Sequence, residues 1–133
     1  MKLSINKALI TVSLGVLLLS GCASHEKQQV AESLAKSRAA AIDSKAPYPT
    51  IDAYQITQAY ASGSTVKINI IYGGKSRITP SRAAKTAAAN YCRNSEIIPL
   101  FDSGVNYQIT IKDISGRTMA QQAVSKDFCE SIK

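Results

Sequence analysis

Cysteines are the residues of this chain whose chemistry depends most on their surroundings. The sequence has three of them: Cys22 near the start, and Cys92 and Cys129 in the C-terminal half. Two thiols can form a disulfide in an oxidising compartment, bind a metal, or supply a nucleophile. The last two uses need a nearby histidine or a CxxC spacing, and neither Cys92 nor Cys129 has one. A disulfide between them is therefore the favoured interpretation, provided that the protein is exported.

The segment before Cys22 has the layout of a secretory signal. Positive charges at Lys2 and Lys7 precede an apolar run over residues 8–19, and the small residues Ser20-Gly21 follow it. As a helix that run would span roughly 18 Å, well short of the roughly 30 Å of a bilayer core. The sequence Leu-Ser-Gly-Cys at 19–22 resembles the bacterial lipobox, which implies cleavage before Cys22 and acylation of that cysteine. The alternative is an ordinary secreted protein with a chance cysteine near its cleavage site.

Acylation of Cys22 would determine where the protein is located, and the cleavage that goes with it would change the length and the net charge of the mature chain. Two or three acyl chains anchor a protein stably, whereas a single chain does so only marginally. Because Ala23 and not Asp follows the cysteine, the lipoprotein resemblance implies the outer membrane, with the protein facing the periplasm. We expect a signal peptide at 1–21, the lipidated cysteine and a tether at 22–29, and one domain at 30–133. The mature chain would carry 14 Lys and Arg against 9 Asp and Glu, a net charge of +5.

Side chains suited to catalysis are sparse. The only histidine, His25, lies in the expected tether, so no Ser–His–Asp or Cys–His set can be built around it. Most carboxylates lie at the ends of predicted elements or in turns, where solvation and capping explain them. The run Gly73-Gly74-Lys75-Ser76 lacks the upstream glycine of a phosphate-binding loop, because Asn69 stands at that place. We therefore expect no enzymatic activity, no metal and no cofactor.

Positive charge gathers around the start of a predicted helix, in Lys75, Arg77, Arg82 and Lys85. A solvated surface is the simpler interpretation, and an acidic partner segment or lipid headgroups near the membrane are the alternative. Nucleic acid is not an expected partner of an exported lipoprotein.

Hydrophobic periodicity and turn residues predict the elements of the domain. A helix is expected over about 26–44, and a Thr79-Pro80 start opens a second one to about Arg93. Strands are expected over 51–60 and 65–72, then 105–113 and 117–125, and a helical turn over 126–132. The apolar segment 96–101 contains Pro99 and is expected to be an edge strand or irregular. This order predicts one α+β domain with a mostly antiparallel sheet and helices on one face.

Two stretches, SGSTVKI at 62–68 and GVNYQITI at 104–111, resemble the type II secretion pilotins of the AspS/YghG type, the beta class of secretin pilotins. The lipobox followed by Ala-Ser-His, the helix that ends in Cys92 and the second cysteine at the C-terminus fit the same pattern. The resemblance runs from Cys22 to about Cys129. It implies a five-stranded sheet with helices on one side and one disulfide.

The resemblance also implies a function. Pilotins bind the C-terminal S-domain of a secretin, usually as a helix in a groove, and their lipid carries the secretin to the inner leaflet of the outer membrane. We expect a monomer when the protein is free. Our hypothesis places the groove on the helix-rich face, at Ala84, Ala88, Tyr91, Ile97, Ile98 and Phe101. The alternative is a periplasmic inhibitor or another envelope binding module, for which the loop Ser62–Ser64 is short.

Overall fold

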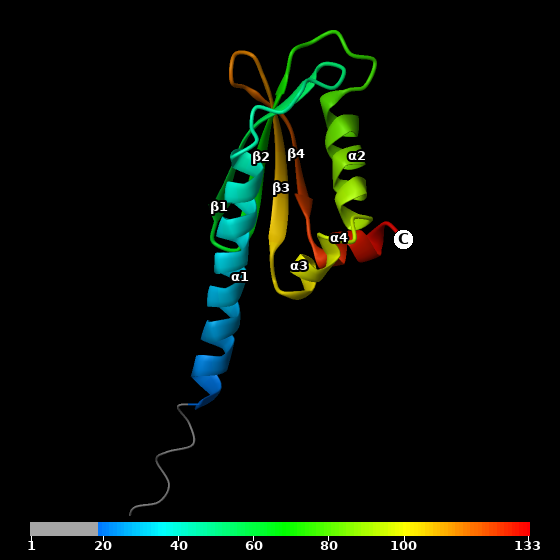
Figure 1. The fold of residues 1–133 in the computed structure, drawn as a ribbon. Coiled ribbons are helices and arrows are strands. Elements are labelled where there is room, and N and C mark those ends of the chain that lie inside the picture. Colours follow the sequence, from blue (N-terminus) through cyan, green and yellow to red (C-terminus); the bar gives the residue numbers. More distant parts are fainter. Residues whose placement is uncertain (1–18) are drawn as a thin grey trace, which may run out of the picture.

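The computed structural model describes the backbone of residues 19–133 and the side chains from residue 24 onward. The predicted signal sequence over 1–18 lies outside the described residues. In chain order the elements are α1 (Leu19–Asp43), β1 (Tyr54–Ser62), β2 (Thr65–Tyr72), α2 (Pro80–Cys92), α3 (Ile98–Asp102), β3 (Asn106–Asp113), β4 (Thr118–Val124) and α4 (Lys126–Ser131). Figure 1 shows α1 alongside β1 and β2, and α2 alongside β4.

The sheet has four strands in the order β1-β2-β3-β4. The outer pairs are antiparallel hairpins, but β2 and β3 run parallel. The expectation of five strands in a mostly antiparallel sheet is therefore wrong, since the described residues form a four-stranded mixed sheet. The parallel pair arises because α2 and α3 return the chain to the end of the sheet at which β2 began.

The segment at 96–101 is neither the edge strand nor the irregular segment that we expected. It enters α3, a short helix with a proline in its first turn. Proline has no N–H group to donate to a sheet, whereas the first turn of a helix does not need that donor. The segment therefore caps one end of the core instead of extending the sheet.

Helix α1 begins earlier than expected. Residues 22–29, which we expected to form a tether merging into a helix, have helical backbone. Their composition of Glu, Lys and Gln favours a helix, and Gln28 Nε2 donates a hydrogen bond to Glu32 Oε1 over 3.3 Å, one turn on. Ala31, Ala35 and Ala39 are buried at helical spacing, and their small side chains let α1 approach the sheet closely.

One face of the sheet carries the core. Register places Val66 beside Tyr107 and Ile68 beside Ile109, and all four side chains are buried. Both α1 and α2 pack against this same face, with Ala35 among the buried residues of α1. The remaining core residues from α2 and the strands are Ala59, Ala84, Ala88, Ile111 and Val124. The two long helices therefore cover one face, as the sequence predicts.

The expected disulfide is present between Cys92 and Cys129. It joins the last residue of α2 to α4, with the two Cα atoms 5.3 Å apart. Each joined helix also has a capped start: Thr79 Oγ1 accepts from the N–H group of Arg82, and Ser125 Oγ accepts from that of Phe128. The C-terminal segment is thereby fixed against the helix layer.

Candidate partner-binding surface

The residues that we predicted to line a partner groove have mostly a different role. Ala84, Ala88, Ile97 and Phe101 are between 0% and 7% exposed and belong to the core. Tyr91 is half-buried against that core. Among the six, Ile98 alone has a substantial exposed area. The spacing of apolar residues along a helix identifies its buried face, but it does not distinguish a filled core from an unfilled groove.

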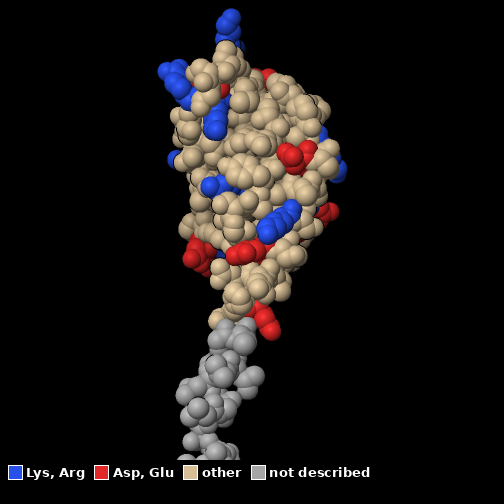
Figure 2. Space-filling model, turned by 90° about the vertical axis from the view of Figure 1, so that its left-hand side faces the viewer, with Lys and Arg blue, Asp and Glu red and all other residues tan. Residues whose placement is uncertain are grey.

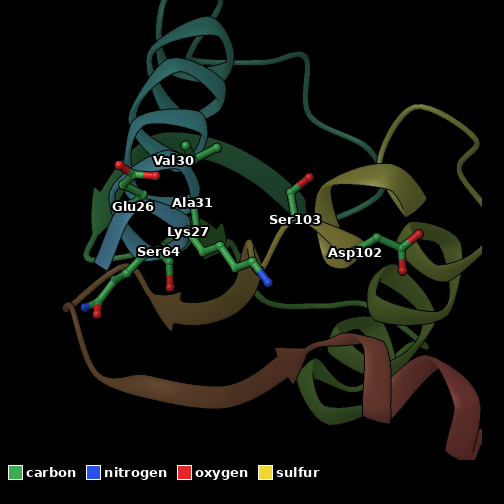
Figure 3. A pocket seen from close by; sticks show the side chains of 9 residues that line it. Glu26, Lys27, Val30, Ala31, Ser64, Asp102 and Ser103 are labelled. Atoms are coloured by element: carbon green, nitrogen blue, oxygen red, sulfur yellow. The ribbon is translucent and has the colours of Figure 1, made fainter. Parts of the chain in front are cut away.

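A pocket of about 770 Å³ opens beside the first turns of α1 (Figure 3). Three segments that are distant in the sequence form it: α1, the β1–β2 turn at Ser64, and the connection from α3 to β3. The lining residues are Glu26, Lys27, Gln28, Val30, Ala31, Ser64, Asp102, Ser103 and Gly104. Sequence reasoning missed this pocket because no single segment carries its pattern.

The pocket combines apolar surface with charged groups. Val30 and Ala31 supply its apolar wall on α1, and Val30 is 55% exposed. The Asp102 carboxylate pairs with Lys126 Nζ of α4 at 2.9 Å. Figure 3 shows the Lys27 side chain extending into the pocket. A largely apolar hollow with few charges is the kind of surface that receives an amphipathic segment.

A second polar cluster lies between α1 and α2, at Arg38, Tyr91 and Tyr107. The rings of Tyr91 and Tyr107 have centroids 5.1 Å apart, and Phe101 meets Tyr107 edge-on at 6.0 Å. Burial raises the pKa of Tyr91 to about 12, with Tyr107 adding to the rise and Arg38 opposing it. Burial also raises the pKa of Tyr107, and the Arg38 guanidinium lowers it in part.

Despite this proximity, two polar atoms of the cluster are not satisfied. Within the part of the chain that the structure describes, Arg38 Nε and the Tyr107 hydroxyl are buried without a hydrogen-bond partner of normal geometry. The sequence carries one signal for this cluster: Arg38 interrupts a helical stripe that is otherwise apolar, formed by Leu34, Ala35, Ala39 and Ile42.

Comparison with known proteins decides the family. The family model described as type II secretion system (T2SS) pilotin, S protein, matches residues 27–129. The chain belongs to this family. It is 30% identical to the type II secretion system pilotin AspS from Vibrio cholerae, with a TM-score of 0.70 over 79% of this chain and 97% of that one.

A second pilotin, EpsS from the type 2 secretion system of Vibrio vulnificus, has the same fold. It is 22% identical, with a TM-score of 0.70 over 79% of this chain and 96% of that one. A comparison with curated proteins gives no significant match. The family match confirms the resemblance seen in the sequence and assigns this pilotin to secretin assembly.

The group of basic residues predicted at Lys75, Arg77, Arg82 and Lys85 lies away from the start of α1. Figure 2 shows several Lys and Arg side chains at the upper end of the view, with others spread lower on the same face. The β2–α2 connection, which carries Lys75 and Arg77, and the start of α2 lie at that end. Helix α1 has 25 residues, a length of roughly 37 Å.

Residues 19–133 contain neither a helix suited to spanning a membrane nor a cluster of metal-binding side chains. None of the helices over residues 19–133 is both long enough and apolar enough to cross a membrane. The same part of the chain holds no group of three or more His, Cys, Asp or Glu side chains placed to bind a metal.

Proposed function

We propose that this pilotin binds the C-terminal S-domain of a type II secretion secretin and directs that secretin to the outer membrane for assembly. The family match over residues 27–129 is the observation that carries this proposal. The site chemistry agrees with it, because a small cross-linked domain with a largely apolar pocket is suited to binding and targeting. The proposal includes no catalytic step for this chain.

The anchor in this proposal is an acylated Cys22, exposed by removal of residues 1–21. The described backbone is helical through Cys22, so the lipid would be attached to the first turn of the helix that supports the domain. Such an anchor holds the domain at the inner leaflet of the outer membrane, facing the periplasm. Two or more acyl chains give this attachment the stability that targeting needs.

Recognition in this proposal uses the pocket beside Val30 and Ala31. An amphipathic helix can place its apolar face in such a hollow, and helix-in-groove binding needs no rearrangement of the sheet. The inhibitor alternative is not favoured by any feature of the fold. Its required inserting loop would be the β1–β2 turn, which is a tight turn with Gly63 at φ +57°.

Calorimetry tests this function directly. The chain from residue 22 onward with Cys22→Ser is titrated with the C-terminal segment of the secretin encoded beside the same secretion system. We expect saturable binding of one segment per pilotin. A scrambled segment of the same composition is the control. Absence of heat and of any shift in the thermal unfolding midpoint would contradict the proposal.

A further inference from the structure

The Arg38–Tyr107 pair is the least satisfied polar site in the described part of the molecule. Buried polar side-chain atoms nearly always have a hydrogen-bond partner, so an exception calls for an explanation. Here two exceptions lie together: Arg38 Nε and the Tyr107 hydroxyl are buried without a hydrogen-bond partner of normal geometry, although the Arg38 guanidinium is close enough to lower the pKa of Tyr107. Tyr107 is 1% exposed, so of these two residues only the half-buried Arg38 can meet a ligand from outside.

The charge of Arg38 is likewise unbalanced. No carboxylate within the described residues lies within ion-pair distance of its guanidinium. The groups that sense its charge are phenols, Tyr91 from α2 and Tyr107 from β3, and neither is an anion at neutral pH. A third nearby phenol, Tyr48, already uses its O–H group, which donates a hydrogen bond to the Ile42 carbonyl oxygen at 3.0 Å. A partly buried cation without a counter-charge is destabilising unless something supplies the charge.

Arg38 carries the kind of donors that an anion receptor needs. A guanidinium presents N–H groups in a planar fork that matches the two oxygens of a carboxylate. The rings of Tyr91 and Phe101 flank Tyr107 and hold it in place. The aromatic surroundings keep the local dielectric constant low, which strengthens a charge-assisted hydrogen bond.

The pair also lies in line with the pocket. Lys27, Ala31, Leu34 and Arg38 follow one another at steps of four, three and four residues, so they share one side of α1. Lys27 and Ala31 line the pocket. Arg38 lies three helical turns further along, roughly 16 Å from Lys27. A helical segment of about 11 residues laid along α1 would reach both places.

We propose that the Arg38 guanidinium, positioned against Tyr107, is the receptor for one carboxylate of the secretin segment whose apolar residues fill the pocket at Val30 and Ala31. This inference rests on the proposed function and specifies the chemistry of the partner. The segment is an amphipathic helix with an Asp, a Glu or its own terminal carboxylate about three turns from the residues in the pocket. A lipid phosphate is a poor occupant, because Arg38 lies about 24 Å along α1 from Cys22.

A double-mutant cycle tests the pairing. Wild-type and Arg38→Met chains are each titrated with the segment and with versions in which its carboxylates are changed, one at a time, to amides. We expect Arg38→Met to weaken binding about 10- to 100-fold and Tyr107→Phe to weaken it less. One amide substitution should weaken wild-type binding by a similar factor and leave Arg38→Met binding unchanged. Arg82→Met, at the other end of the domain, is the matched control and should bind as wild type.

The outcomes separate this inference from the function on which it rests. If wild type binds the segment and Arg38→Met binds it equally well, the inference is wrong and the function stands. If wild type does not bind, both fail. Inorganic phosphate and acetate are titrated alongside: stabilisation by these ions without coupling to any segment carboxylate would show a small-anion site and overturn the inference. Should Arg38→Met not fold, the amide series measured on wild type and on Tyr107→Phe decides in its place.

Discussion

Gly104 packs directly against Ala31: a Cβ atom at Gly104 would lie 3.4 Å from the Cβ of Ala31. The contact brings the α3–β3 connection against α1 and forms the back of the pocket, which both residues line. Gly104 also has φ +90°, a conformation that residues with a side chain rarely adopt. Both conformation and position therefore favour glycine here.

Gly104→Ala should separate the effect of the positive φ of Gly104 on stability from the effect of its place in the pocket on binding. The added methyl group would meet Ala31 at an ordinary van der Waals distance, so the loss of stability should come from the backbone, at about 1–2 kcal/mol. Gly74→Ala is the matched control, because Gly74 has φ +86° and open space around it. Denaturant unfolding should show similar losses for both variants, while calorimetry shows weaker segment binding for Gly104→Ala alone. Equal binding by the two variants would argue against the pocket as the binding site.

Val30→Glu should weaken segment binding without loss of stability. Val30 is 55% exposed on α1, and Glu is a good helix former, so the unfolding midpoint should stay within a few degrees of wild type. A carboxylate in the apolar wall should weaken segment binding at least about 10-fold, because it must be desolvated on docking. Ile114→Glu, at a residue 83% exposed in the β3–β4 turn, is the control and should bind normally. Loss of binding in both variants would point away from the pocket.

The Cys92–Cys129 disulfide should contribute about 4 kcal/mol to stability, from the entropy it removes from the unfolded chain. The double variant Cys92→Ser/Cys129→Ser should lower the free energy of unfolding by about that amount. Tandem mass spectrometry of a non-reduced digest of exported protein should recover the two cysteines in one linked peptide pair. Two free thiols in that material would contradict the assignment.

Asp113 should make the stability of the fold depend on pH in the acidic range. Hydrogen bonds from the Ser115 hydroxyl and the Arg117 backbone N–H lower the pKa of this carboxyl from 3.8 to about 2. The folded state thus binds the proton less readily than the unfolded state. Its stabilising contribution is present above pH 3.8 and is lost as pH falls towards 2. Asp113→Asn should be less stable than wild type at neutral pH, and the gap should close in urea titrations between these pH values. A gap that is independent of pH would refute this.

Much of the local structure could be predicted from sequence because each signal lies within one segment. Alternation over 105–113 predicts β3, and Thr79-Pro80 predicts the start of α2. The parallel pairing of β2 and β3 was missed because alternation has the same period in parallel and antiparallel strands. Pro99 was assigned to a possible edge strand although it fits the first turn of α3 equally well.

The candidate site was harder to predict because it depends on residues brought together by the fold. Ala84 and Ala88 look alike whether they line a groove or a core, and the structure places them in the core. The pocket needs Ala31 beside Gly104, and the anion receptor needs Arg38 beside Tyr107. Neither pairing follows from spacing along the chain. A charged residue within an apolar helical stripe, as at Arg38, was the available signal.

The location of the secretin in cells tests the central proposal most directly. The secretin is expressed with wild-type pilotin, with Cys22→Ser exported by a signal peptide that does not direct acylation, or with Ile114→Glu as a control. Membranes are separated by density, and the secretin multimer in each fraction is measured. Wild type and Ile114→Glu should give multimers in the outer membrane, while Cys22→Ser should still bind the secretin but leave it outside that fraction. Outer-membrane multimers in equal amount with Cys22→Ser, or without any pilotin, would contradict the proposal.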